Sequence, residues 1–314
     1  MKAEQEPRQR FEPSALRSVR WMRMTKVSTD RPNVVTPRPA STVVLARPAA
    51  AGFQIFLVRR HDNVAFMAGA HVFPGGRVDD ADYVADAERW CDGVDAAVSR
   101  MPSRPPAEAI ALHVAAVREL FEESGVLLAR ADRFASGDAD DMPAVRLAEW
   151  RRDLIARGVT MVALAARERL RLTLDALTLF AHWVTPESEA RRFDTCFFLA
   201  VAPAGQEAIH DEHEADAGTW IYPAEAIERC RAGAIALPPP TWTTLRALSQ
   251  FQRLEDAAAW AREQSAPRIQ PRVVEREDGG RIIALPGDPL YPPVEGFVAI
   301  DTRFLLENGR WRPV

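Results

Sequence analysis

Residues 118–126 read Arg-Glu-Leu-Phe-Glu-Glu-Ser-Gly-Val, and they end a longer segment with the periodicity of a helix. Apolar side chains recur at helical intervals from Ala107 onward, which predicts an amphipathic helix from Ala107 to Ser124. Gly125 follows that range, and glycine is the residue that most readily takes the left-handed backbone conformation at the end of a helix. We therefore expect the acidic stretch to form the last turns of one helix.

The acidic residues of this stretch share one side of the predicted helix. Glu119, Glu122 and Glu123 are spaced at i, i+3 and i+4, an interval that brings their Cβ atoms within about 6 Å of one another. Like charges at that distance repel, so an isolated helix would lose roughly a few tenths of a kcal/mol for each pair. The spacing has two interpretations: a solvated acidic face, which is the more common case, and a site for a divalent cation held by hard oxygen ligands.

A glycine-rich loop precedes the helix in the chain. Residues 66–76 read Phe-Met-Ala-Gly-Ala-His-Val-Phe-Pro-Gly-Gly, whose glycines permit tight turns and close approach of a ligand to the backbone. Gly76 is followed by five residues and then by Asp82. Residues 76–82 and 118–126 resemble the two halves of the Nudix box, in the correct order and with Asp82 where the family usually has glutamate. This resemblance implies a Nudix hydrolase, an enzyme that cuts diphosphate linkages.

The two halves lie much further apart than in the usual family pattern. That pattern has seven residues between the acid and the arginine, whereas 35 separate Asp82 from Arg118. The branch of the peroxisomal coenzyme A diphosphatases tolerates an insertion at this place. Three segments resemble that branch: the glycine-rich loop, residues 192–198 (Arg-Phe-Asp-Thr-Cys-Phe-Phe) and residues 237–240 (Leu-Pro-Pro-Pro). Because of the insertion, spacing no longer fixes Asp82 to the acid position of the motif.

The resemblance implies roles for the residues that match the motif. It implies that Mg²⁺, or Mn²⁺, is held by Glu119, Glu122, Glu123 and the backbone carbonyl of Gly76. It implies further that Arg118 takes part in catalysis by orienting these carboxylates through charge-assisted hydrogen bonds. The physical logic is that three glutamates would repel a diphosphate unless cations lie between them.

Hydrolysis also needs a general base that takes a proton from water. Glu119 is one candidate, and the other is Glu214 in the acidic loop at residues 210–216, His-Asp-Glu-His-Glu-Ala-Asp. Related enzymes also carry a glutamate six residues before the position of Trp220. An ordinary polar turn is the more common case for such a loop, and its two histidines have no supporting cysteine or third histidine nearby that would indicate zinc.

Five arginines are candidates for substrate binding, since a guanidinium group pairs with phosphate oxygens in bidentate fashion. They are Arg59, Arg60, Arg77, Arg191 and Arg192. Each of them can instead be a surface charge. Trp242 and the prolines at 238–240 could line an apolar pocket for a pantetheine arm, although packing in the core is the more common role for such residues.

The substrate class stays open among three hypotheses. The first is coenzyme A or acyl-coenzyme A, which rests on the resemblance to the branch. The second is another nucleoside diphosphate derivative, such as ADP-ribose or NADH. The third is a Nudix domain that senses a ligand without catalysis. The complete set of helix glutamates favours an enzyme, and the chain shows no helix-turn-helix or basic appendage for DNA.

The composition is that of a globular protein without a nucleic-acid or membrane partner. The 314 residues include 40 basic and 44 acidic side chains, a balance that gives no general attraction to nucleic acid or anionic lipid. The three cysteines are widely spaced and indicate free thiols. No apolar run approaches the roughly 20 residues of a membrane span, and the N-terminal segment lacks the apolar stretch of a secretory signal. We therefore expect a cytoplasmic protein.

The order of strands and helices predicts an α+β fold, a Nudix-type α/β/α sandwich with a mixed sheet, an inserted segment and extra helices. We expect a flexible arm at 1–39, a Nudix domain at 40–265 and a β-rich extension at 266–314 that packs on the same domain. Within the domain we expect an insertion of little apolar pattern at about 83–106 and a helical segment at about 143–170. The insertion could cover the cleft or form the contact of a homodimer, and its composition does not distinguish the two.

Runs of β-branched and aromatic residues predict the strands. These runs are Ser41–Ala46, Phe53–Arg59, Thr178–Val184, Phe193–Ala202 and Gly218–Tyr222. A short helix is expected to start at Pro223, and a longer one to run from about Thr241 to Arg262. Asn308 and Gly309 are expected to form the turn of a hairpin.

Overall fold

The computed structural model describes residues 34–61, 68–131, 144–210, 215–293 and 299–314. Most of the N-terminal arm, residues 1–33, therefore lies outside the described residues, as do Glu214 and the first two residues of the glycine-rich loop.

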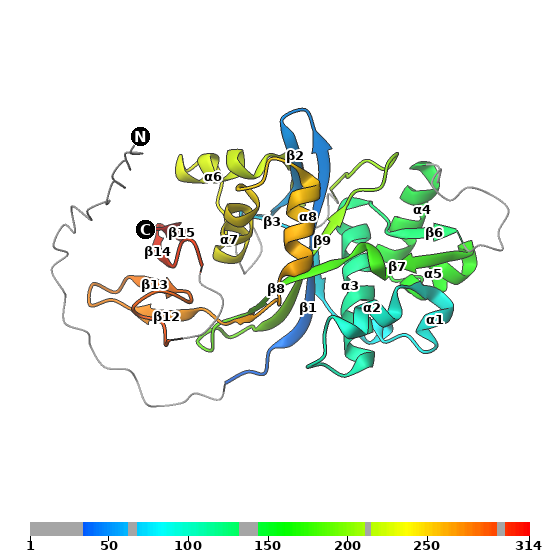
Figure 1. Ribbon diagram of the computed structural model, residues 1–314, viewed down its shortest axis with the longest axis horizontal. Helices are drawn as coiled ribbons and strands as arrows, with labels where there is room; N and C mark the ends of the chain where they lie inside the picture. The colour runs from blue at the N-terminus through cyan, green and yellow to red at the C-terminus, as the bar shows by residue number, and fades with distance from the viewer. Residues whose placement is uncertain (1–33, 62–67, 132–143, 211–214, 294–298) are drawn as a thin grey trace, which may run out of the picture.

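A mixed sheet forms the centre of the molecule (Figure 1). Its strands follow the order β10-β2-β1-β9-β8-β11, with β3 paired to β2 and β4 paired to β1. β1 runs parallel to β9, whereas its pairs with β2 and β4 are antiparallel. The bounds are β1 Arg38–Ala49, β2 Gly52–Arg60, β3 His71–Val72, β4 Gly75–Arg77, β8 Thr178–Val184, β9 Phe193–Val201, β10 Ala215–Ile221 and β11 Arg268–Ile269. These strands confirm the predicted runs to within a few residues.

Helices cover both faces of the sheet because successive side chains of a strand point to opposite sides. Val43 and Leu45 of β1 enter one core beneath helix α3 (Pro106–Ser124), and Val44 and Ala46 enter a second core on the opposite face. The helices of the second core are α6 (Pro223–Arg231), α7 (Pro239–Leu248) and α8 (Leu254–Glu263). This layering confirms the predicted α+β sandwich with a mixed sheet.

The segment between Asp82 and α3 is folded, although its sequence shows little apolar pattern. It contains α1 (Ala87–Trp90), β5 (Cys91–Asp92) and α2 (Val94–Ser99), and these elements are too short to display a helical period. β5 pairs with β7 (Leu170–Thr173), which also pairs with β6 (Ala129–Ala131), so the insertion joins a second, three-stranded sheet. Helices α4 (Ala144–Ile155) and α5 (Met161–Glu168) lie beside this sheet (Figure 1).

The predicted single helix from Thr241 to Arg262 is wrong, because the chain leaves the helical conformation between α7 and α8. Arg253 has extended backbone angles, with φ −115° and ψ 140°. Leu248 and Leu254, on either side of the break, are both buried, with exposed fractions of 1% and 6%. The break lets both helices turn an apolar side toward the sheet, which one straight helix of that length would not do.

The C-terminal part forms a separate antiparallel sheet, which lies at the left of Figure 1. Its strands are β12 (Arg272–Glu275), β13 (Arg281–Ala284), β14 (Arg303–Glu307) and β15 (Arg310–Pro313). Asn308 and Gly309 have φ values of 51° and 76°, as the predicted hairpin turn requires. Phe304 packs in the second core together with Trp242, whose Nε1 donates to Asp301 at 2.8 Å. Trp242 is therefore a core residue, not the wall of a pocket.

The three cysteines are free and buried, in agreement with the expectation from their spacing. None of the helices in the described ranges combines the length and apolar character that crossing a bilayer demands.

Candidate active site

The acidic stretch forms the last two turns of α3, as expected. Gly125 ends the helix with φ 72°, and its N–H donates to the carbonyl of Phe121 at 2.9 Å. Arg118 and Glu119 are unusually buried for charged residues, with exposed fractions of 7% and 8%. Charged groups in such a position have to be paired, and the pairing defines the site.

Arg118 ties the two halves of the motif together. Its Nε and Nη2 donate to the two carboxylate oxygens of Asp82 at 2.9 and 2.8 Å. Its Nη1 donates to Glu119 at 2.8 Å and to Glu122 at 3.1 Å, and Nη2 also reaches the carbonyl of Arg77 at 2.9 Å. Asp82 is 1% exposed. The fold therefore brings Asp82 to Arg118 despite the insertion, a contact that spacing alone left open.

The charge on Arg118 is secured by these contacts. Burial by itself would lower its pKa, but the hydrogen bonds to Asp82 and the negative charges of Glu119 and Glu122 raise the pKa above its usual value. The side chain is a permanent cation that holds three carboxylates in place.

The glycine-rich loop meets the same carboxylates from the other side. Gly75 N–H donates to Glu123 Oε2 at 3.1 Å. A methyl group added at Gly76 would lie 2.4 Å from Glu119 Oε1, so the glycine backbone lies directly against that carboxylate. β4 is held there by its register with β1, where Gly76 is opposite Ser41, and Ser41 donates to a carbonyl of α3 at 2.6 Å.

The donors at this place fit a hard divalent cation. Glu119, Glu122 and Glu123 offer carboxylate oxygens, and the missing side chain at Gly76 lets the Glu119 carboxylate lie directly against the backbone. Within the described ranges, no three acidic, histidine or cysteine side chains converge so closely that they would enclose a metal by themselves. Mg²⁺ does not require such a cage, because it usually binds through one or two carboxylates and completes its shell with water and substrate phosphate.

The candidate base Glu214 lies outside the described residues. Beside it in the chain, Asp216 pairs with Arg59 and with Nδ1 of His61. Arg59 thus lies close to the acidic loop, at the end of β2.

Arg60 and Arg77 differ in their surroundings. Arg60 follows Phe56 and Val58 at the period of a strand, and these two pack in the core beneath α3. Arg60 is therefore on the sheet face of the glutamates, and its buried Nε has no hydrogen-bond partner among the described residues. Arg77 is exposed and pairs with Asp79, with 2.9 Å between Nε and Oδ1.

Arg192 does not suit the substrate-binding role that we expected for it. It is 5% exposed, and its guanidinium group donates to the backbone carbonyls of Thr185 at 3.1 Å and Val35 at 2.8 Å. These bonds fasten the chain before β1 to the turn before β9. The neighbouring Arg191 is exposed at the surface.

Sequence reasoning missed a brace on the catalytic helix from α4. Nε of Arg151 donates to the carbonyl of Glu122 at 2.8 Å, beside Gly125. Arg157, just after α4, lies 3.6 Å from Asp79. Both contacts join residues far apart in the chain, so no local pattern could indicate them.

A family model, curated relatives and a solved structure that are similar to this chain all belong to one family. Residues 98–248 match the family model described as the NUDT19 Nudix domain. The chain is 32% identical over 312 residues to the acyl-coenzyme A diphosphatase NUDT19 of Homo sapiens, covering 87% of this chain and 80% of that protein. It is 31% identical over 302 residues to the protein of the same name from Gallus gallus, covering 81% of this chain and 80% of the relative. A solved Nudix hydrolase from Alicyclobacillus acidocaldarius is similar with a TM-score of 0.58 and 29% identity, over 71% of this chain and 96% of that one.

Proposed function

The chain belongs to the Nudix hydrolases, in the branch of the coenzyme A diphosphatases, and from that premise we propose that it hydrolyses the diphosphate linkage of coenzyme A or acyl-coenzyme A with the help of Mg²⁺ or Mn²⁺. The observation that supports catalysis most directly is the buried contact of Arg118 with Asp82, Glu119 and Glu122. It keeps three of the four carboxylates of the motif in one place. A domain that only senses a ligand would not need that arrangement.

In this proposal the glutamates of α3 and the carbonyl of Gly76 hold the cation. A bound divalent cation neutralises phosphate oxygens and lowers the pKa of a bound water. Arg118 limits the freedom of Glu119 and Glu122, so less conformational entropy is lost when substrate and cation bind. Preorganised carboxylates of this kind favour the transition state over the free substrate.

The reaction adds water to one phosphorus of the anhydride and breaks the bond to the bridging oxygen, which gives two phosphate monoesters. A carboxylate has to accept the proton of the attacking water. Glu119 is suited to this step because its carboxylate lies against Gly76 and is aligned by Arg118. Glu214 remains the second candidate.

Arg60 is the arginine best placed to bind the diphosphate. It lies on the sheet face that α3 covers, and its Nε has no hydrogen-bond partner among the described residues, so a phosphate oxygen would supply one. Arg59, Arg77 and Arg191 are weaker candidates, because the first two are paired with aspartates and the third lies at the surface.

A substrate panel tests the proposal. Coenzyme A, acetyl- and longer acyl-coenzyme A, ADP-ribose, NADH and diadenosine polyphosphates are incubated with the enzyme and Mg²⁺, with and without EDTA, and products are followed by mass. We expect metal-dependent release of adenosine 3′,5′-bisphosphate from coenzyme A species. Preference for ADP-ribose or NADH would keep the reaction and reject the substrate class. Tight binding without turnover of any compound would instead indicate a sensor.

Variants of the glutamates test the cation site. Glu122→Gln and Glu123→Gln are each expected to lower kcat by at least about 10²-fold while the protein stays folded. Glu149→Gln is a matched control, since Glu149 is an exposed glutamate on α4 that is not part of the motif. Turnover at the wild-type rate in both site variants at saturating Mg²⁺ would reject the assignment of these ligands.

A further inference from the structure

A basic cluster lies at the end of β2, apart from the carboxylates of α3. Its centre is His71 on β3, which is directly opposite Arg59 of β2 in the strand register. Side chains opposite each other on neighbouring strands lie on the same face, with Cβ atoms about 5 Å apart. The imidazole and the Arg59 guanidinium therefore share one small area of the sheet.

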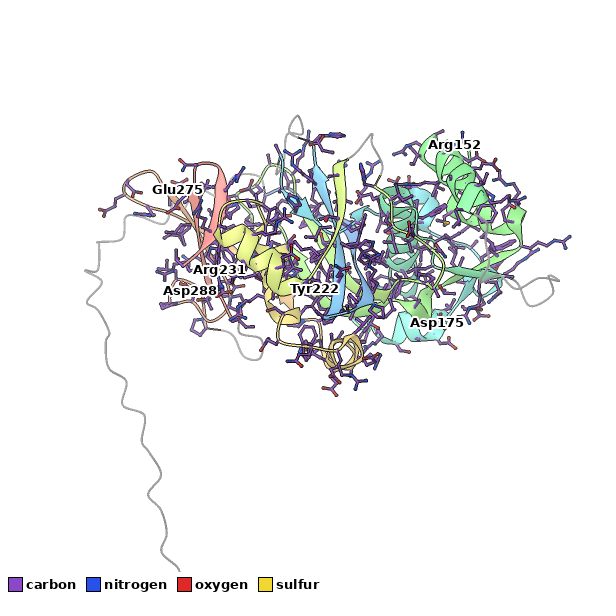
Figure 2. The ribbon with its side chains drawn as sticks, turned by 90° about the horizontal axis from the view of Figure 1, so that it is seen from above. Arg152, Asp175, Tyr222, Arg231, Glu275 and Asp288 are labelled. Carbon is purple, nitrogen blue, oxygen red and sulfur yellow. The ribbon has the colours of Figure 1, made fainter. Side chains whose placement is uncertain are left out.

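Helix α6 adds a third basic residue, Arg229. The carbonyl of Arg229 accepts from Ala234 at 2.9 Å, and the carbonyl of Ala236 accepts from the backbone N–H of His71 at 2.8 Å. The turn after α6 is thus fastened to β3. Figure 2 labels Tyr222, the residue before α6, and Arg231, its last residue; Arg229 lies in the last turn of the helix.

The cluster contains two guanidinium groups, of which that of Arg59 also pairs with Asp216, and one ring nitrogen that a ligand can still use. Nδ1 of His71 is buried and has no hydrogen-bond partner in the described ranges. Burial, followed by the charges of Arg59 and Arg229, lowers the pKa of His71 to about 4, so the imidazole is neutral at pH 7. Among the described residues, Arg229 pairs with Glu225 at 3.7 Å on an exposed helix surface, which is a weak interaction.

This cluster is separated from the glutamates by the sheet itself. His71 and Phe73 alternate with Val72, and Phe73 packs in the second core, beneath α6 and α7. Val72 packs on the opposite side, against the core of α3. An anion at His71 is therefore a different group from the one at the carboxylates. Arg59 and Arg60 are consecutive residues at the end of β2, so the cluster lies one residue along the strand from the arginine proposed to bind the diphosphate, on the other face.

We propose that Arg59, His71 and Arg229 bind a second phosphate of the substrate, a phosphate monoester that is not part of the diphosphate to be cut. Two guanidinium groups and an imidazole N–H are the donors that a dianionic phosphate needs. This inference rests on the proposed function, because coenzyme A carries such a group at the 3′ position of its ribose, whereas ADP-ribose and NADH do not. The cluster would then select coenzyme A species among nucleoside diphosphate derivatives.

Binding of two small nucleotides by the full chain tests the inference without turnover. Adenosine 3′,5′-bisphosphate and adenosine 5′-monophosphate differ by the 3′-phosphate alone, and calorimetry gives both Kd values. We expect the bisphosphate to bind about 10-fold more tightly, as two charge-assisted hydrogen bonds allow. Arg229→Gln should reduce this preference to about 2-fold or less.

Arg231→Gln is the matched control, since Arg231 is on the same helix, exposed, and paired with Glu228. It should keep the wild-type preference. Equal affinity of the wild-type protein for the two nucleotides, or a preference that survives in both Arg229→Gln and His71→Gln, would reject the inference. Failure of the protein to hydrolyse any coenzyme A species would contradict the proposed function, while the Kd ratio would still decide on the second phosphate site.

Discussion

Replacement of Asp82 by asparagine tests whether the distant first half of the motif anchors the catalytic helix. The side chain accepts two hydrogen bonds from Arg118 and a third from the backbone N–H of Asp79 at 2.8 Å. Asparagine keeps the shape but removes the negative charge, and its amide N–H₂ would face a guanidinium group that is also a donor. The substitution therefore leaves Arg118 with part of its charge uncompensated in a buried position.

The expected cost follows from that burial. The side chains of Asp82 and Arg118 are 1% and 9% exposed, so solvent screens their interaction very little. Loss of one partner of a buried pair costs about 3–5 kcal/mol, and the lower end applies because Glu119 and Glu122 still contact Arg118. For a chain of 314 residues, about 3 kcal/mol corresponds to a fall in Tm of about 4–5 °C.

Urea denaturation followed by circular dichroism measures the change, with Asp80→Asn as the control. Asp80 is exposed at the start of the same short 3₁₀ helix. The kcat of Asp82→Asn should also fall, by about 10-fold, because Arg118 then holds Glu119 and Glu122 less firmly. If Asp82→Asn unfolds at the same urea concentration as the control and keeps the wild-type kcat, Asp82 is not the anchor and the reasoning fails.

Three further predictions concern the site and the core. Gly76→Ala should lower kcat by about 10-fold with little change in unfolding free energy. The reason is that the added methyl group meets the Glu119 carboxylate and not backbone. Kinetics combined with urea denaturation checks this prediction. Arg151→Met should lower kcat by about 5-fold, because the last turn of α3 loses its contact with α4. Arg152→Met is the control, since Arg152 is exposed on α4 (Figure 2), and it should keep the wild-type kcat. Equal rates in the two variants would contradict a supporting role for Arg151. Burial lowers the pKa of His113 from 6.5 to about 4, so its contribution to stability is complete above pH 6.5 and is lost as the pH falls toward 4. When the pH falls from 7 to 5, the wild type should therefore lose about 2 kcal/mol more unfolding free energy than His113→Gln loses. An equal loss in the two proteins would count against a buried neutral histidine.

Much of the site could be predicted because several of its residues lie close together in the sequence. The spacing of Glu119, Glu122 and Glu123 fixes their common side on any helix, and Gly125 marks where that helix ends. The hairpin at Asn308 is another local feature, since its turn depends on the backbone freedom of adjacent residues.

Other features were missed or misjudged because they depend on contacts between distant segments. Arg192 looked like the other arginines in the sequence, and only its burial against two backbone carbonyls separates it from them. The segment between α7 and α8 contains no proline or glycine, the residues that usually indicate the end of a helix in a sequence. The break follows from the need of Leu248 and Leu254 to pack against the sheet.

The sequence by itself determined the family motif, the acidic side of the helix and the sandwich of strands and helices, because periodicity and backbone preference act over a few residues. Only the tertiary structure decided that Asp82 reaches Arg118 across the insertion, that Arg151 supports the last turn of α3, and that the charge of Arg229 acts on His71. Those interactions form because folding brings side chains that are far apart in the sequence close together at partly buried positions. No pattern over a few consecutive residues can indicate which distant residues will meet.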